Sequence, residues 1–293
     1  MTYNLLKKEE FENLGLTVFL YEHEKTKANI IYVKTCDENK TFAISFKTPP
    51  TDSKGKAHIM EHSVLNGSKK YRTKDPFMDM ASSSLQTFLN AMTYPDKTVY
   101  PVSSENDKDF SNLVDVYLDA VFNPLAIEKK EILDQEGWHY EMEDGKITGI
   151  SGVVYNEMKG ALSDPESLIY NDINSLLYKD SPYEYESGGN PREIGDLTYD
   201  EFVNFYKNHY HPSNSLIYFY GNMDIDLLLS HLDEEYLSKY DFRKFDNEIE
   251  VKENYYPEII EGTYPASKIE DDSDYLSYAF LASSALDSKD YLT

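Results

Sequence analysis

Three short runs near the start of the chain alternate between apolar and polar residues. They lie at residues 16–23, 30–35 and 41–47. Each run is rich in β-branched and aromatic residues, and together with a period of two this composition predicts β-strands. Because only short polar stretches separate the runs, we expect these strands to pair in sequence as a meander. Residues 90–102, interrupted at 95–97, and residues 214–220 predict further strands.

After Pro49 and Pro50 the pattern changes to the period of three to four that is typical of α-helices. The expected helices cover residues 55–67, 107–122, 128–141 and 153–162, a segment after Pro165, and residues 199–208. Strands followed by helices and then by another strand predict an α+β domain. We expect a largely antiparallel sheet with helices packed on one face.

The composition shifts near Asn247 to a charged stretch that contains Pro257 and Gly262. We therefore expect a first domain at residues 1–247, a linker at 248–257 and the start of a second domain at 258–293. A solvated surface loop explains the shift equally well. Because the last apolar segment is followed at once by the end of the chain, we expect the chain to be a fragment of a longer protein.

Charge and composition exclude several classes of function. The chain has 28 Lys and Arg against 53 Asp and Glu, a formal net charge of −25, and a surface this acidic repels nucleic-acid phosphates. No apolar run approaches the roughly 18–20 residues of a membrane span, so we expect no membrane partner. The first residues lack the features of a signal peptide, which predicts a cytoplasmic location. The single cysteine, Cys36, excludes a disulfide framework and a cysteine-rich zinc site.

The chemistry concentrates in the stretch His58-Ile59-Met60-Glu61-His62. On a helix, His58 and His62 are one turn apart, so both imidazoles project from one face and can share a cation. Zinc accepts imidazole nitrogens, and a catalytic site leaves one position for water. Glu61, at the edge of that face, is suited to take a proton from this water. The pattern matches the inverted H-x-x-E-H motif; an amphipathic helix with surface His and Glu is the alternative.

A catalytic zinc site needs a third protein ligand. Glu157 is the best-placed candidate, because it is a lone acid in an otherwise apolar helix start, where an unpaired buried carboxylate would be costly. A simple surface glutamate is an equally good interpretation. His139, beside the single tryptophan Trp138, is expected to be a packed helix histidine rather than a further ligand.

Eight stretches extend the likeness well beyond the five-residue motif. They are residues 57–67, 74–77 (KDPF), 87–102 (TFLNAMTYPDKTVYPV), 112–124 (NLVDVYLDAVFNP), 135–141 (QEGWHYE), 152–161 (GVVYNEMKGA), 187–191 (SGGNP) and 210–214 (YHPSN). With them the chain resembles the inverted-zincin metallopeptidases related to pitrilysin and insulin-degrading enzyme, in the presequence-protease and falcilysin branch. The likeness covers most of residues 55–222.

The resemblance implies that His58, His62 and Glu157 bind one Zn²⁺ per chain and that Glu61 is the general base. It also implies a domain of the pitrilysin and mitochondrial processing peptidase type, followed by the start of a related domain. We therefore predict a zinc metalloendopeptidase that hydrolyses short unstructured peptides, with Glu61 activating a zinc-bound water.

The resemblance also implies a substrate surface. Asn90 and Ala91 would lie on an exposed edge strand to which a peptide adds as a further β-strand, with Met92 beside an apolar pocket. The full-length enzyme would close two halves around its peptide, so we expect the isolated chain, without its C-terminal half, to be weakly active. The alternative function is that of a non-catalytic relative that binds peptides or scaffolds a complex.

Overall fold

The computed structural model describes residues 2–74 and 76–246, and beyond them residues 248–251, 259, 261, 263–264 and 274–281. The helices and strands that it describes lie between Tyr3 and Lys239. The predicted linker at 248–257 and second domain at 258–293 fall largely outside the described residues and stay predictions. Among the helices described, none is both long enough and apolar enough to cross a membrane.

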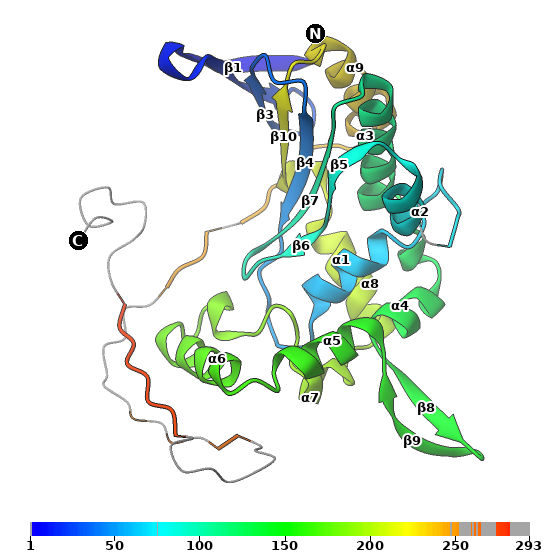
Figure 1. The fold of residues 1–293 in the computed structure, drawn as a ribbon, viewed down its shortest axis with the longest axis vertical. Helices are drawn as coiled ribbons and strands as arrows, with labels where there is room; N and C mark the ends of the chain where they lie inside the picture. The colour runs from blue at the N-terminus through cyan, green and yellow to red at the C-terminus, as the bar shows by residue number, and fades with distance from the viewer. Residues whose placement is uncertain are drawn as a thin grey trace.

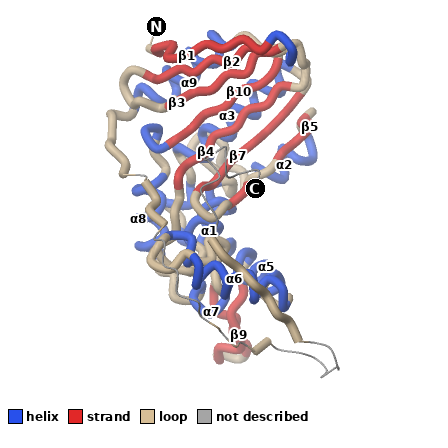
Figure 2. Tube along the Cα trace, turned by 90° about the vertical axis from the view of Figure 1, so that its left-hand side faces the viewer, coloured by secondary structure: helices blue, strands red, loops and turns tan. Residues whose placement is uncertain are grey.

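A single large sheet forms the upper half of the domain (Figures 1 and 2). Its strands are β1 (Tyr3–Phe11), β2 (Leu16–His23), β3 (Asn29–Lys34), β4 (Lys40–Lys47), β5 (Gln86–Leu89), β6 (Met92–Thr93), β7 (Lys97–Ser104) and β10 (Ser215–Gly221). Their order is β1-β2-β3-β10-β4-β7-β5, with β6 also paired to β7. Every pairing is antiparallel except that of β10 with β3. The predicted α+β class with a largely antiparallel sheet is confirmed.

The expected meander is wrong at one place, because β10 lies between β3 and β4. Ile217 of β10 is level with Ile30 of β3 and with Ile44 of β4, and all three side chains are fully buried. This row of apolar side chains gives the sheet a continuous core face. The late strand therefore completes the middle of the sheet rather than its edge.

The helices fall into two groups (Figure 1). The α-helices are α1 (Lys56–Val64), α2 (Pro76–Ser83), α3 (Asp107–Phe122), α4 (Lys130–Glu136), α5 (Val153–Ala161), α6 (Pro165–Leu177), α7 (Pro191–Ile194), α8 (Tyr199–His209) and α9 (Ile225–Glu235). Helices α3 and α9 lie beside the sheet, where Tyr3 of β1 donates a hydrogen bond to the carbonyl of Leu229 in α9 (2.9 Å). Helices α1 and α4 to α8 form the lower half.

The predicted helix at 128–141 is too long. Helix α4 ends at Glu136, and the chain continues as β8 (His139–Glu143) and β9 (Lys146–Ser151), a separate hairpin that projects from the lower half (Figure 1). Asp144 and Gly145 form its turn with φ values of 50° and 75°, the conformation that an Asp-Gly pair favours in a two-residue hairpin. His139 is consequently exposed on β8, and its prediction as a packed helix histidine is wrong.

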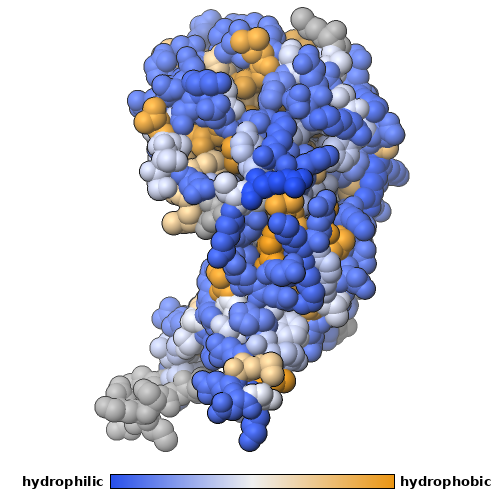
Figure 3. Space-filling model, turned by 90° about the vertical axis from the view of Figure 1, so that its right-hand side faces the viewer, coloured by the Kyte–Doolittle hydropathy of each residue, from blue (hydrophilic) through white to orange (hydrophobic). Residues whose placement is uncertain are grey.

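Helix α1 crosses beneath the sheet and is buried on nearly all sides. Seven of its nine residues are buried, and it contacts α4, α5, α8, β6 and β7. Gly55, just before it, has a φ of 70°, and a Cβ there would lie 3.0 Å from the carbonyl oxygen of Gly188. The loop at 188–189 can therefore approach the start of α1. Unlike the buried helix α1, the face of the molecule in Figure 3 is mostly hydrophilic, with apolar residues in small patches.

Candidate metal centre

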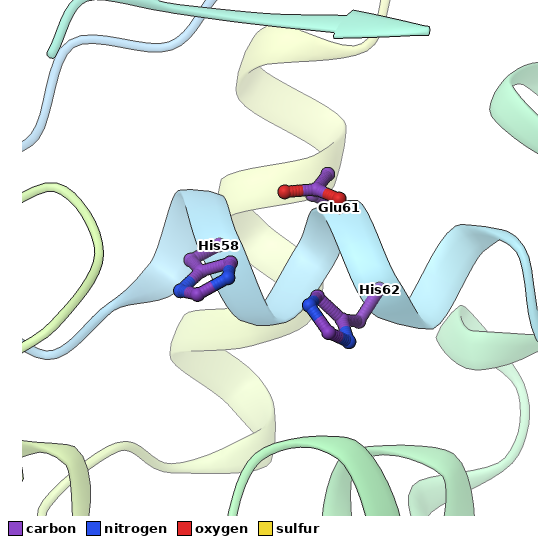
Figure 4. Close-up of side chains that lie close together, drawn as sticks. All are labelled: His58, Glu61 and His62. Atoms are coloured by element: carbon purple, nitrogen blue, oxygen red, sulfur yellow. The ribbon is translucent and has the colours of Figure 1, made fainter. Parts of the chain in front are cut away.

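Helix α1 presents three groups that are able to bind a cation. One ligand atom from each of His58, Glu61 and His62 lies within 4.8 Å of the others. The two imidazole rings lie on the same side of the helix, with ring centroids 5.0 Å apart (Figure 4). The predicted spacing on one helix face thus holds, and the three side chains come from a single turn of α1.

Glu157 brings a second carboxylate to the two rings from α5. Its Oε1 lies 3.7 Å from His58 Nε2, and its Oε2 lies 3.6 Å from His62 Nε2. Its side chain is 52% exposed, so the expectation that it is a buried carboxylate is wrong. The exposure has a simple cause, because Glu157 faces an open pocket.

The Nδ1 atoms of the two rings lie close to groups that accept hydrogen bonds. His58 Nδ1 lies 3.0 Å from the carbonyl oxygen of Gly188, and His62 Nδ1 lies 3.4 Å from Glu136 Oε2. A carbonyl oxygen only accepts hydrogen bonds, so Nδ1 of His58 carries the proton and Nε2 keeps its lone pair. The Nε2 atom of His58 is therefore free to bind zinc, and the Nε2 atom of His62 faces the same carboxylate of Glu157, so the donor set fits this metal.

The buried carboxylates and imidazoles shift one another's protonation. Burial raises the pKa of Glu61, although His62, His58 and a hydrogen bond from Thr93 act in the opposite direction. Burial alone would lower the pKa of His62, but the contact with Glu136 and the charges of Glu61 and Glu157 raise it. Protons therefore compete with a cation for His62, because only the neutral imidazole binds metal.

Strand β6 connects Glu61 to the predicted substrate segment. Thr93 Oγ1 donates a hydrogen bond to Glu61 Oε2 (2.9 Å). Just before this strand, the Asn90 N–H donates to the carbonyl of Pro101 (3.2 Å), and Tyr117 Oη donates to the Asn90 carbonyl (3.0 Å). The Ala91 N–H donates to the side chain of Asn90 (2.9 Å). The segment lies between β5 and β6 at the edge of the sheet.

A pocket of about 900 Å³ joins these groups. All of the residues predicted for the site line it, namely His58, Glu61, His62, Asn90, Ala91, Met92 and Glu157. It is also lined by Thr93, Glu136 and Gly188, which the sequence analysis did not assign. All three lie in quoted stretches, Thr93 in TFLNAMTYPDKTVYPV, Glu136 in QEGWHYE and Gly188 in SGGNP, but no stretch by itself indicates a contact with α1.

Two stretches of the chain match models of known protein families. A family model described as "Insulinase (Peptidase family M16)" matches residues 48–170, and one described as "Peptidase M16 inactive domain" matches residues 196–293. The first match includes β7 and the second includes β10, and both strands belong to the large sheet. The two matched stretches therefore contribute strands to one sheet.

The chain is also similar to several curated proteins. It is 49% identical over 289 residues to protein HypA of Clostridium perfringens, covering 97% of this chain and 30% of that protein. It is 47% identical to presequence protease 1, chloroplastic/mitochondrial, of Arabidopsis thaliana (80% of this chain, 22% of that protein). It is 44% identical to the mitochondrial presequence protease of Drosophila melanogaster (81% and 23%). The chain thus spans less than a third of the length of these relatives.

Proposed function

Since this chain belongs to the M16 (insulinase) family of peptidases, we propose that it forms the zinc-binding catalytic domain of a metalloendopeptidase that cleaves short, unstructured peptides. One observation carries the proposal. The Nε2 atoms of His58 and His62 both face the carboxylate of Glu157, while Glu61 lies beside them on the same helix turn. Two imidazoles, a carboxylate ligand and a free carboxylate form the group that zinc-dependent hydrolysis requires.

His58, His62 and Glu157 would hold the zinc, which when bound polarises a scissile carbonyl and lowers the pKa of water. Glu61 is the general base in this proposal. It takes a proton from the attacking water and later delivers it to the leaving amine. Its burial favours this task because a raised pKa brings a carboxylate closer to the working pH. Thr93 fixes the orientation of the carboxylate.

The substrate in this proposal is an extended peptide that lies along the segment at Asn90 and Ala91. Main-chain hydrogen bonds to a sheet edge are largely independent of sequence, so they suit a peptidase with many substrates. Met92 would contact a side chain of the peptide from the pocket wall. A folded protein cannot offer such a free strand, and unstructured peptides are therefore preferred. The cytoplasmic location stays a prediction from the sequence.

The second candidate function is peptide binding without hydrolysis. The match of residues 196–293 to an inactive M16 domain favours it, but that stretch contains none of the four residues at α1 and α5. A binding subunit needs no general base, whereas here Glu61 is buried and held by Thr93. We therefore place the peptidase first.

Zinc content and peptide cleavage test the proposal together. After exhaustive dialysis, the wild-type chain should retain about one zinc ion, and Glu157→Gln should lose most of it. Glu61→Gln should keep the zinc and lose cleavage of an unstructured reporter peptide, measured at high protein concentration. Cleavage by Glu61→Gln at the wild-type rate would contradict its role as base. A zinc-free wild-type chain would place the binding function first.

A further inference from the structure

A hydrogen bond that the proposed chemistry does not use joins the sheet to the loop after α6. Tyr183 Oη donates to Asp96 Oδ2 (2.8 Å), although the two residues are 87 positions apart in the sequence. Tyr183 lies in a short 3-10 helix, Pro182–Glu184, and Asp96 lies in the turn between β6 and β7. Burial raises the pKa of Tyr183, and the hydrogen bond to Asp96 raises it further, to about 12. The hydroxyl therefore keeps its proton and remains a donor at neutral pH.

Both partners of this bond are held by other parts of the fold. The Thr48 N–H donates to the Asp96 carbonyl (2.8 Å) and attaches the turn to the residue that follows β4. The ring of Tyr178, the first residue after α6, makes a T-shaped contact with the ring of Tyr183, with centroids 5.6 Å apart. A bond between two restrained groups fixes the separation of the elements that carry them.

The same two elements line the pocket of the candidate metal centre. Residues 90–94, which lead into the turn at Asp96, line it from the sheet, and residues 186–188, which follow Tyr183, line it from the loop. The hydrogen bond therefore limits how far these two groups of lining residues can separate.

Each group of lining residues also contacts the metal-binding helix α1. Thr93 donates to Glu61 (2.9 Å), and His58 Nδ1 donates to the carbonyl of Gly188 (3.0 Å). A change in the separation of the two groups would therefore move a peptide bound at residues 90–92 relative to both His58 and Glu61.

A peptide on a sheet edge needs more than main-chain pairing to select its register. Nearly every residue of the peptide offers the same N–H and C=O groups, so pairing alone allows the strand to slip along the edge. A slip of one residue turns each side chain to the other face of the strand and brings a different peptide bond to the reacting groups. The register is then selected by the fit of the side chains in the pocket, which requires walls at a fixed separation.

We infer that Tyr183 is a positioning residue for the bound peptide, an inference that rests on the peptide surface of the proposed function. Its hydrogen bond to Asp96 keeps residues 90–94 at a fixed distance from residues 186–188. The peptide then binds in one register and presents one of its bonds to Glu61. Without the hydroxyl, the two walls separate more easily, so the peptide binds more weakly and in several registers.

The first test is the peptide affinity of the 293-residue chain. All variants carry Glu61→Gln so that the probe, an unstructured peptide with a fluorescent label, is not consumed, and fluorescence anisotropy gives its dissociation constant. Tyr183→Phe should raise this constant roughly tenfold, because a hydrogen bond to a charged acceptor is lost. Tyr178→Phe is the matched control, since it also loses a hydroxyl but keeps the ring contact, and it should leave the constant unchanged. An unchanged constant in folded Tyr183→Phe would overturn the inference.

The second test is the position of cleavage, in chains that retain Glu61. Mass spectrometry of the products should show that Tyr183→Phe cuts the peptide at additional, neighbouring bonds, whereas Tyr178→Phe should give the wild-type products. A domain that is merely less stable would lose activity without moving the cut. Weaker binding with unchanged cleavage positions would therefore overturn the positioning role.

Substitution of Asp96 tests the same bond from its other end, and it serves alone should Tyr183→Phe not fold. Asp96→Asn leaves an oxygen that can accept the hydrogen bond but removes its charge, so peptide binding should weaken by only a few fold. No weakening would count against the inference. The double variant should lose no more affinity than Tyr183→Phe, because both changes affect one contact; additive losses would overturn the inference.

The outcomes separate this inference from the proposed function. A chain that binds the peptide but cleaves none of it would overturn the peptidase, and the dissociation constants would still decide the role of Tyr183. A chain that binds no peptide would overturn the inference and the proposed peptide surface together, while its zinc content would still test the metal centre.

Discussion

Thr93 Oγ1 donates a hydrogen bond of 2.9 Å to Oε2 of Glu61, which lies on a different element of the fold. Thr93 lies on β6, and Glu61 lies on α1. Residues 90–92, next to Thr93 in the chain, form the segment proposed to bind the peptide. The proposed general base and the proposed substrate surface are therefore joined through the hydroxyl group of Thr93.

Thr93→Val should lower kcat and leave KM nearly unchanged. A hydrogen bond to a charged group contributes about 1.5–3 kcal/mol, so a loss of roughly 10-fold to 100-fold is expected if the reaction uses this contact. Steady-state cleavage of an unstructured peptide measures both constants. Thr93→Ser keeps the hydroxyl and should retain most of the activity. A wild-type kcat in Thr93→Val, at wild-type zinc content, would show that Glu61 does not need this partner.

Tyr117→Phe should affect peptide binding rather than the chemical step. Its hydroxyl donates to the Asn90 carbonyl (3.0 Å), and its side chain is fully buried. Loss of a neutral hydrogen bond costs about 1 kcal/mol, so KM should rise roughly fivefold as the segment loosens. Tyr206→Phe removes a comparable bond to the carbonyl of Val121 and serves as the control. Equal KM values in the two variants would argue against a role for this segment in binding.

Gly55→Ala should destabilise the domain and weaken zinc binding. The left-handed φ of Gly55 alone costs a non-glycine residue about 1–2 kcal/mol. The new Cβ would also press on the loop at 188–189, whose carbonyl contacts His58. Gly145→Ala is a matched control, because Gly145 has a φ of 75° but no atom near the new Cβ. Thermal unfolding and zinc affinity of both variants check this, and zinc binding should fall only in Gly55→Ala.

Asp115→Asn should reduce stability at neutral pH but not in acid. Burial would raise the pKa of Asp115, but hydrogen bonds from Tyr236, Tyr71, Lys70 and His231 lower it from 3.8 to about 2. A lowered carboxyl pKa stabilises the fold fully above the unfolded value, and this stabilisation is lost as the pH falls from about 4 to 2. The contribution at pH 7 is about 2 kcal/mol.

Urea unfolding of the wild type and of Asp115→Asn at several pH values measures this difference. The two free energies of unfolding should converge as the pH falls from 4 toward 2. Asp172→Asn, which removes an exposed carboxylate from α6, should leave the free energy of unfolding nearly unchanged. A gap that stayed constant down to pH 2 would mean that the charge of Asp115 is not what stabilises the fold.

Strong local patterns predicted most of the elements around the site. The strand at residues 16–23 and the helix at 107–122 have the predicted bounds, because their apolar residues repeat with a clear period. The helices that carry His58 and Glu157 were also predicted. Each differs from its prediction only at the ends, where local patterns are weakest.

The missed elements have weak or misleading patterns. Strand β1 is exposed over most of its length and therefore shows no apolar alternation. The apolar pattern at 128–141 predicts a helix that runs into the hairpin, although Asp144-Gly145 is a strong turn signal. Helices α2 and α9 were likewise not predicted. Of the site, the motif predicted the residues on α1, but the contacts of Glu136 and Thr93 depend on how distant elements pack, which no local pattern contains.

The place of β10 in the middle of the sheet has a consequence for synthesis. While the chain is being made, β3 and β4 emerge early, and each has one edge that stays open until residues Ser215–Gly221 follow. Open strand edges pair readily with other chains. A chain that ended before β10 would therefore keep two open strand edges, and these edges would favour pairing with other chains.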